Sequence, residues 1–332
     1  MRVLVTGGAG YIGSHTVRLL ANRGDDVVVL DDLSSGHREA VGGAPLVVGD
    51  VADRALVASV LRDRRIEAIV HFAALKSVEE SVRQPERYFE HNVAGSVGLF
   101  AAARDAGVAI VVNSSTCAVY GDPLELPVRE AAPTRPTNAY GESKLIVEMI
   151  LARLAQTGRL RHVTLRYFNA AGAWPDGSLG EDWTGAQNLV PALMRAAATG
   201  SPLPVFGTDY PTPDGTAVRD YVHVLDLAEA HVAALDHMAR GGSSLTANLG
   251  TGVGTSVLEA VAAVSAATGR SIAIDVRARR PGDVPAIWAD PTLAATVLGW
   301  RARRGISAIT ESAWRWHTAH PRGFDSARAD QR

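Results

Sequence analysis

The sequence predicts an α/β fold: a doubly wound parallel sheet, followed by a second, smaller domain of mixed α/β structure. Three observations lead to this prediction. Short, continuous apolar runs alternate with amphipathic segments, and a glycine-rich turn follows the first apolar run. After residue 167 this alternation ends and residues typical of loops become frequent. Continuous apolar strands are typical of parallel sheets that are covered by helices on both faces.

The N-terminal elements alternate along the chain. Apolar runs predict strands at 3–6, 27–30, 45–48, 67–72, 109–112 and 162–167. Apolar residues at helical spacing predict helices at 11–22, 53–63, 82–105 and 139–156. Because parallel strands are joined by right-handed crossovers, these elements form one doubly wound sheet.

Beyond residue 167 the signals are those of loops and separate helices. Glycine, aspartate, alanine and tryptophan are frequent at 169–187, and prolines stand at 202, 204, 211 and 213. Helices are predicted at 189–199, 226–238 and 256–268, the last opened by a capping box of Ser256 and Glu259. We therefore expect a first domain at 1–167, a second at 168–325 with part of 214–250 returning to the first, and a frayed polar tail at 326–332.

Composition limits the class of protein. The 332 residues are 47% apolar, which predicts a large folded core, and the net charge of −2 argues against a nucleic-acid binder. A single cysteine, Cys117, forms neither an internal disulfide nor a cysteine-based zinc site, so we expect no metal and a reducing, cytoplasmic location. No secretory leader or membrane span is expected, because no suitable apolar run is present.

The glycine-rich turn carries the first functional signal. Gly7, Gly10 and Gly13 follow a predicted strand directly and open a predicted helix, which is the context required of the Rossmann dinucleotide fingerprint. The helix N-terminus then faces the pyrophosphate. Asp31, at the end of the second strand, accepts hydrogen bonds from ribose hydroxyls, which favours NAD, while neighbouring His37 and Arg38 leave NADP open. The alternative is a purely structural turn.

A second signal combines Tyr140 and Lys144 on one helix face, one turn apart. A tyrosine that acts as a base near pH 7 needs its pKa lowered by about 3 units, and a nearby ammonium supplies stabilisation of that order. Lys76 and Lys144 are the only lysines, which marks both as candidates for positions that require an ammonium. Thr116, at the carboxyl end of a predicted strand, is a candidate hydrogen-bond donor to substrate. The alternatives are an ordinary surface pair and a hydroxyl that caps a turn.

Three further features have structural interpretations. Residues 250–254 are glycine-rich but lack the lysine of a P-loop, so we interpret them as a strand-to-helix connection. His223 is interpreted as a core imidazole, and Cys117 as a small core side chain without a neighbouring base.

Several ordered segments extend these signals. They are VTGGAGYIGSH at 5–15, FAALK at 72–76, VYGD at 119–122, LRYFN at 165–169, RDYVHV at 219–224 and RPGD at 280–283. With the glycine turn and the Tyr-x-x-x-Lys pair, the chain resembles the UDP-glucose 4-epimerases, a family of the extended short-chain dehydrogenase/reductase superfamily. The likeness covers about residues 1–322.

This resemblance implies roles for individual residues. Tyr140 is implied as the base, Lys144 as its partner and Thr116 as the hydroxyl that contacts substrate. The residues implied to bind NAD are Gly7, Gly10, Tyr11, Ile12, Gly13, Asp31, Asp50, Val51, Phe72, Ala73, Lys76, Asn92, Tyr140, Lys144 and Tyr167. Those implied to bind the nucleotide sugar are Thr116, Asn169, Asn188, Leu189, Val205, Phe206, Arg219, Arg280, Asp283 and Ile287.

The implied reaction is inversion at C4 of a UDP-hexose by transient oxidation with NAD. UDP-glucose and UDP-galactose are the expected pair, with N-acetylated UDP-hexosamines as further candidates, and a homodimer formed through 82–105 and 139–156 is expected. Two departures are visible: the stretch 34–44 is shorter than in many relatives, and Ile287 stands where relatives carry tyrosine or a small residue.

Four alternatives stay open. The chain acts on another UDP-sugar, such as UDP-xylose, UDP-arabinose or UDP-N-acetylglucosamine, or it is a nucleotide-sugar dehydratase, a decarboxylase or a non-catalytic NAD sensor. Related dehydratases carry Asp-Glu after the threonine, where this chain has Cys117 and Ala118. A decarboxylase needs a cation for the sugar carboxylate, and a sensor commonly lacks the tyrosine or the lysine.

Overall fold

The computed structural model describes residues 1–183, 186, 188–280 and 282–324, so the predicted tail lies outside the described residues. The N-terminal strands are β1 (Arg2–Thr6), β2 (Asp26–Asp31), β3 (Leu46–Val48), β4 (Ala68–His71), β5 (Ile110–Thr116) and β6 (Arg161–Tyr167). The helices between them are α1 (Tyr11–Arg23), α2 (Arg54–Asp63), α3 (Val78–Arg83), α4 (Pro85–Tyr88), α5 (Gly95–Asp105) and α6 (Ala139–Gln156). Short helical turns η1 (Arg38–Val41), η2 (Phe89–Ala94) and η3 (Cys117–Tyr120) complete this part.

The later elements mix both types. Their strands are β7 (Asn169–Ala171), β8 (Leu203–Phe206), β9 (Val218–Arg219), β10 (Tyr221–His223), β11 (Leu245–Leu249), β12 (Thr255–Ser256), β13 (Ile274–Arg277) and β14 (Ala286–Ile287). Their helices are α7 (Leu189–Thr199), α8 (Val224–Ala239), α9 (Val257–Thr268), the turn η4 (Ala294–Leu298) and α10 (Ile306–Ala319).

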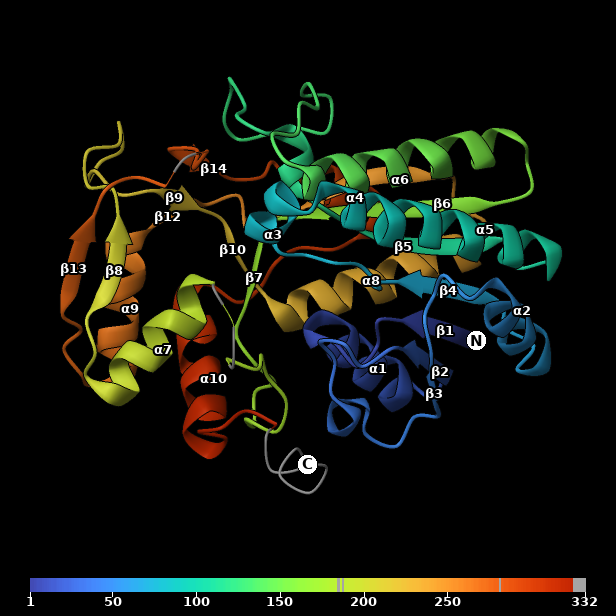
Figure 1. The fold of residues 1–332 in the computed structure, drawn as a ribbon, viewed down its shortest axis with the longest axis horizontal. Coiled ribbons are helices and arrows are strands. Elements are labelled where there is room, and N and C mark those ends of the chain that lie inside the picture. Colours follow the sequence, from blue (N-terminus) through green and yellow to red (C-terminus); the bar gives the residue numbers. More distant parts are fainter. Residues whose placement is uncertain (184–185, 187, 281, 325–332) are drawn as a thin grey trace.

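Seven parallel strands form the main sheet, in the order β11-β6-β5-β4-β1-β2-β3. Apolar side chains of β1 point alternately to the two faces of the sheet, and helices cover both faces. Val3 and Val5 pack in one apolar cluster with α1 and α8, while Leu4 packs in another with α2, α5 and α6. The two clusters place α1 and α8 on one face of the sheet and α2, α5 and α6 on the other (Figure 1). The predicted doubly wound fold is confirmed.

Two predicted elements differ in extent. The strand predicted at 109–112 runs on as β5 to Thr116, because Asn113–Thr116 continue to pair with β6 and are buried despite being polar. The helices predicted within 82–105 are α4, η2 and α5, together with the end of α3, which begins earlier, at Val78. Gln84 leaves helical geometry (φ −136°, ψ 62°) directly before Pro85, which disfavours the α region in the preceding residue.

Most of the later elements form a separate group of helices and short strands on the left of Figure 1. There α7, α9 and α10 share an apolar cluster with β8, and β8 pairs with β13. In contrast, β11 pairs with β6 and so belongs to the main sheet, and α8 packs with α1 on one face of that sheet. The division of the chain into domains at residue 167 stays a prediction.

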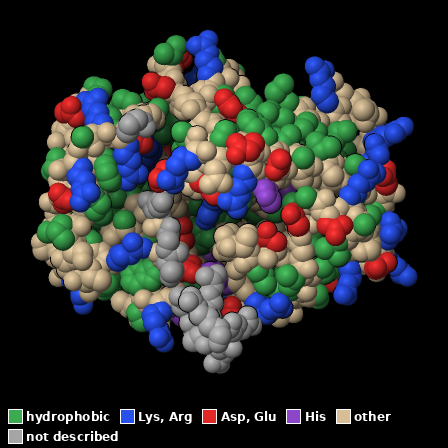
Figure 2. Space-filling model, viewed as in Figure 1, with side chains coloured by type: hydrophobic (Ala, Val, Ile, Leu, Met, Phe, Trp, Pro, Cys, Tyr) green, Lys and Arg blue, Asp and Glu red, His purple; other side chains and the backbone are tan. Residues whose placement is uncertain are grey.

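The surface carries both signs of charge. Figure 2 shows Lys and Arg side chains interspersed with Asp and Glu over the face it presents. Among the described residues, no helix combines the length and the apolar character that crossing a membrane demands.

Candidate active site

A cavity of about 710 Å³ opens at the carboxyl ends of the central strands. This is the edge at which doubly wound sheets bind ligands, and the volume lies within the ordinary range of ligand sites. The structure brings most of the predicted site residues to its wall. They are Gly7, Gly10, Tyr11, Ile12, Gly13, Asp31, Asp50, Val51, Phe72, Ala73, Lys76, Thr116, Tyr140, Lys144, Tyr167, Asn169, Asn188, Leu189, Arg219, Asp283 and Ile287.

Four predicted residues do not line this cavity. Val205 is buried in the apolar cluster around α7, and Arg280 lies over the Phe206 ring, with its guanidinium carbon 3.9 Å from the centroid. Asn92 is buried beneath the wall, where it accepts from the Leu75 amide at 2.8 Å and donates to the Ser143 hydroxyl at 3.0 Å. Asn92 therefore fixes the loop that follows β4 against α6.

The glycine-rich turn packs tightly. Gly7 has φ +70°, in the left-handed region, and a Cβ on it would lie 2.6 Å from the Ala73 nitrogen. A Cβ on Gly13 would lie 2.2 Å from the Gly7 carbonyl oxygen. Only glycine fits at both positions, and the first residues of α1, Tyr11 to Gly13, line the cavity.

Asp31 closes the same end of the cavity. Its carboxylate accepts from the backbone amides of Ala9 and Leu33, each at 2.9 Å, and only 7% of the residue is exposed. Burial raises the pKa of this carboxyl group, and the two amide donors oppose that rise. The acid is thereby fixed beside the glycine-rich turn.

Tyr140 and Lys144 lie on the first two turns of α6. Asn138 caps this helix by accepting from the Gly141 amide at 2.9 Å, which fixes where the helix begins. Lys144 is 5% exposed, and its Nζ donates to the Ser114 carbonyl oxygen at 2.9 Å. Thr116, the last residue of β5, is hydrogen-bonded to the Tyr140 phenol.

The electrostatics of this pair differ from the sequence-based expectation. Burial raises the pKa of Tyr140, the neighbouring Tyr167 adds to the rise, and the Thr116 hydrogen bond opposes it. Burial also lowers the pKa of Lys144 to about 8, against the charge of Glu148. The expected lowering of the tyrosine pKa by Lys144 is therefore not produced by the protein's own groups, because desolvation outweighs the effect of one cation.

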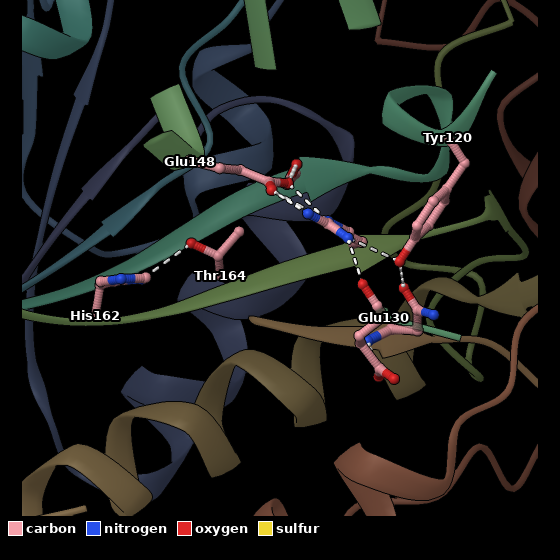
Figure 3. Close-up of polar contacts among 8 residues, drawn as sticks. Tyr120, Glu130, Glu148, His162 and Thr164 are labelled. Carbon is pink, nitrogen blue, oxygen red and sulfur yellow. Dashed lines mark hydrogen bonds and ion pairs between the residues drawn. The ribbon is translucent and has the colours of Figure 1, made fainter. Parts of the chain in front are cut away.

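A buried polar network lies behind these residues, on the α6 side of the sheet (Figure 3). The Ser115 hydroxyl and the Arg166 guanidinium both donate to Glu148, one turn beyond Lys144. Arg166 also donates to the Tyr120 hydroxyl at 2.9 Å, and that hydroxyl donates to Asn248 at 2.7 Å. On the opposite side of the same strands, the Ser114 and Tyr167 hydroxyls are hydrogen-bonded at the cavity wall.

The C-terminal wall carries charges that suit a phosphorylated ligand. Arg219 lines the cavity, and its guanidinium lies 3.9 Å from the Asp283 carboxylate. Asp220, the next residue, is buried and accepts from the amides of Thr251 and Gly252, which holds the glycine-rich segment 250–254 in place. That segment connects β11 to β12 and α9, as predicted.

Sequence reasoning missed Glu181. It is 6% exposed on the cavity wall, accepts from the Asn188 amide at 3.0 Å, and has its pKa raised by burial. It lies in a loop without periodicity, so the sequence offered no signal for it. Cys117 packs against the main apolar cluster, as predicted, but it is only half-buried and also lines the cavity, and burial raises the pKa of its thiol to about 12. His223 is a buried, hydrogen-bonded core imidazole, as predicted.

The residues present fit a dinucleotide. The clashes that side chains would make at Gly7 and Gly13 define a backbone cradle, and the fixed carboxylate of Asp31 lies on the same wall. The described residues contain no group of three or more His, Cys, Asp or Glu side chains placed to bind a metal ion.

The comparison with known families decides the assignment. The NAD dependent epimerase/dehydratase family matches residues 3–250. The chain belongs to this family. Its cofactor is therefore NAD, in agreement with the prediction from Asp31.

Individual relatives match over almost their full length. The UDP-glucose 4-epimerase of Lactobacillus helveticus is 45% identical, with 98% of this chain and 99% of the relative covered. The structure of the enzyme from Stenotrophomonas maltophila, with bound NAD and formylated UDP-arabinopyranose, is 44% identical over 97% of this chain and 99% of that chain, with a TM-score of 0.94. The Brucella ovis enzyme in complex with NAD is 47% identical over 94% and 97%, with a TM-score of 0.92. The resemblance to UDP-glucose 4-epimerases is confirmed.

Proposed function

We propose that this chain is an isomerase that interconverts UDP-glucose and UDP-galactose by inversion at C4. The observation that carries the proposal is the placement of Tyr140, Lys144 and Thr116 on one wall of a cavity whose other walls hold the glycine-rich turn and Arg219. The full-length likeness to UDP-glucose 4-epimerases supports the choice of reaction.

In this proposal Tyr140 removes the proton from the 4-hydroxyl group and returns a proton after inversion. NAD, held at the glycine-rich turn, would supply the reversible hydride acceptor for C4. Because burial raises the pKa of Tyr140, the tyrosinate needs more positive charge than the protein supplies alone; Lys144, one turn along α6, would provide part of it and the cationic nicotinamide of bound NAD the rest. Thr116 donates a hydrogen bond to the sugar oxygen, and the carbonyl of Ser114 holds the Lys144 ammonium in place.

The nucleotide end of the substrate stays bound while the 4-keto sugar rotates about the diphosphate and presents its other face. We assign Arg219 to the diphosphate, because a guanidinium matches phosphate oxygens well. Asn188, oriented by Glu181, contacts the same part of the substrate. Arg280 joins them only after its guanidinium leaves the Phe206 ring, and Val205 and Phe206 support this wall from outside the cavity. Leu189, Asn169, Asp283 and Ile287 complete the sugar site.

The decisive experiment mixes the purified protein with UDP-galactose and assays UDP-glucose. The proposal predicts conversion in both directions to one equilibrium ratio, without net production of NADH. A 4-keto-6-deoxy sugar would instead support the dehydratase alternative, and a UDP-pentose formed from UDP-glucuronate in a parallel assay would support the decarboxylase alternative. Absence of any product from a protein that holds NAD would support a sensor.

We also propose that the chain forms a homodimer through α3 to α6. Figure 2 shows hydrophobic side chains gathered over these helices, and Val82, Val97 and Met149 are 66%, 46% and 60% exposed. Light scattering at micromolar concentration should give twice the chain mass, and Val97→Glu with Met149→Glu should give a monomer. Val276→Glu, on the exposed strand β13, is the matched control. A cytoplasmic location is proposed from the single cysteine.

A further inference from the structure

Three segments that are far apart in the sequence meet beside the cavity. His37 Nε2 lies 2.8 Å from Asp182 Oδ2, and the His37 ring stacks on Phe324, with centroids 4.5 Å apart and an angle of 22° between the planes. The side chains of His37 and Asp182 are 12% and 15% exposed, so both are largely shielded from solvent. We refer to these three residues as the His37 cluster.

On one side, the His37 cluster continues directly into the cofactor wall. Ser34 and Ser35, just before His37, line the cavity. The His37 amide donates to the Ala9 carbonyl at 3.0 Å, and Gly36 is so close to Asp31 that a Cβ would lie 2.9 Å from its carboxylate. The loop that ends at His37 therefore rests on the glycine-rich turn and on Asp31.

On the other side, Asp182 belongs to a loop that is fixed to α10. Its neighbour Glu181 lines the cavity, and the Glu181 carbonyl accepts from Trp316 Nε1 at 2.9 Å. Trp183 stacks on His317, with ring centroids 4.4 Å apart. Because each loop is held to its own wall, any opening of the cavity between them has to break the His37–Asp182 contact.

We propose that the His37 cluster is a latch that retains NAD, because the contact between His37 and Asp182 joins two walls of the cofactor cavity. The proposed reaction regenerates NAD in every turnover, so retention does not slow it. The inference rests on the family's cofactor and not on the identity of the sugar.

The test measures the rate at which bound NAD is released. The protein is loaded with radiolabelled NAD, chased with excess unlabelled NAD and separated by rapid gel filtration. His37→Ala and Asp182→Ala should each release NAD about fivefold faster, the ratio expected for loss of one partly shielded contact. The effect of the double variant should be smaller than the product of the two single effects, because both substitutions remove the His37–Asp182 contact.

Two further variants sharpen the result. His37→Gln keeps an N–H donor but loses the ring that stacks on Phe324, so its release rate should lie between those of wild type and His37→Ala. Asp236→Asn is the matched control, because it breaks the 2.7 Å ion pair between Arg23 and Asp236, which does not line the cavity. It should release NAD at the wild-type rate.

The outcomes separate a latch from a purely structural contact. Thermal unfolding is measured in excess NAD for every variant, and faster release with an unchanged midpoint supports the latch. Wild-type release rates in both alanine variants overturn it, as do additive effects that follow a lowered midpoint. If wild type holds NAD and the variants do not differ, the latch alone fails; if wild type holds no NAD, the cofactor assignment fails with it.

Discussion

Arg166 donates to both carboxylate oxygens of Glu148, with Nε 3.0 Å from Oε1 and Nη2 2.6 Å from Oε2. Both side chains are more than nine-tenths buried, and the pair raises the pKa of Arg166 well above its usual value. Glu148→Gln should therefore lower the free energy of unfolding by about 3–5 kcal/mol, because it leaves a buried guanidinium without a counter-charge. Urea unfolding measures this loss.

The same helix offers a control for that prediction. Glu142→Gln changes the same chemistry at an exposed position of α6 and should alter stability by less than about 0.5 kcal/mol. The double variant Glu148→Gln with Arg166→Gln should recover part of the loss, since no unpaired charge is left. Equal stability of Glu148→Gln and Glu142→Gln would show that the buried pair is not a stabilising contact.

Tyr140→Phe should lower kcat by at least about 100-fold, because the phenyl ring cannot accept the proton. The variant should still contain NAD when denatured and assayed, because the glycine-rich turn and Asp31 are untouched. Tyr210→Phe removes a buried phenol outside the cavity and should leave kcat unchanged. A Tyr140→Phe enzyme within a few fold of wild type would remove Tyr140 from the mechanism.

Lys144→Arg should also lose most of the activity, although the positive charge is kept. The Lys144 ammonium is buried and donates to the Ser114 carbonyl, and a planar guanidinium is too broad for that position. Steady-state kinetics on UDP-galactose measure the loss. A wild-type rate in Lys144→Arg would contradict the view that this chain retains its lysine because an ammonium is required.

The pH dependence of stability has a defined sign at His162. Burial lowers the pKa of this ring to about 4, so the unfolded chain takes up a proton below about pH 6.5 that the folded chain does not (Figure 3 shows its contact with Thr164). The stability that the neutral ring supports at pH 7.5 is therefore lost as the pH falls. As the pH is lowered from 7.5 to 5.5, the free energy of unfolding of His162→Gln should rise by about 1 kcal/mol relative to that of wild type, measured by urea unfolding. A difference between the two proteins that does not change with pH would contradict the lowered pKa of His162.

The fold was predictable because local signals and packing agree in the sheet. Val3 and Val5 form a continuous apolar run with Leu4, as expected when both faces are covered. β5 was predicted too short, because the polar residues that end it look like a loop; only pairing with β6 and burial identify them as strand. The short strands β9, β12 and β14 have two residues each, so no periodicity reveals them.

The candidate site was predictable where a motif fixes a residue on a regular element. Gly7, Gly13 and Tyr140 are such residues, and all three line the cavity. The contact between His37 and Asp182 was not predictable, because it joins two loops that are separated by more than a hundred residues. The spacing between Tyr140 and Lys144 predicted a lowered pKa for Tyr140. Desolvation, which depends on the packed environment and not on the sequence pattern, is instead the largest influence and raises this pKa.

Ile287 is expected to control which UDP-sugars the cavity admits. It is 4% exposed, lines the cavity, and pairs in register with Arg219 through β14 and β9. Isoleucine lacks the ring and hydroxyl of the tyrosine that some relatives carry, yet its branched side chain is stiff. We therefore expect turnover of UDP-N-acetylglucosamine, with kcat/KM reduced by about 10–200-fold relative to UDP-glucose.

Measuring kcat/KM on both sugars for wild type and Ile287→Tyr tests this expectation. The larger ring should fill the space beside Arg219 and lower the ratio of acetylated to plain substrate further, while turnover of UDP-glucose changes little. Ile274→Tyr adds the same ring on β13, at a residue that is 40% exposed and outside the cavity, and should leave the ratio unchanged. If wild type does not turn over the acetylated sugar, or if Ile287→Tyr and Ile274→Tyr give the same ratio, selection occurs at another part of the wall.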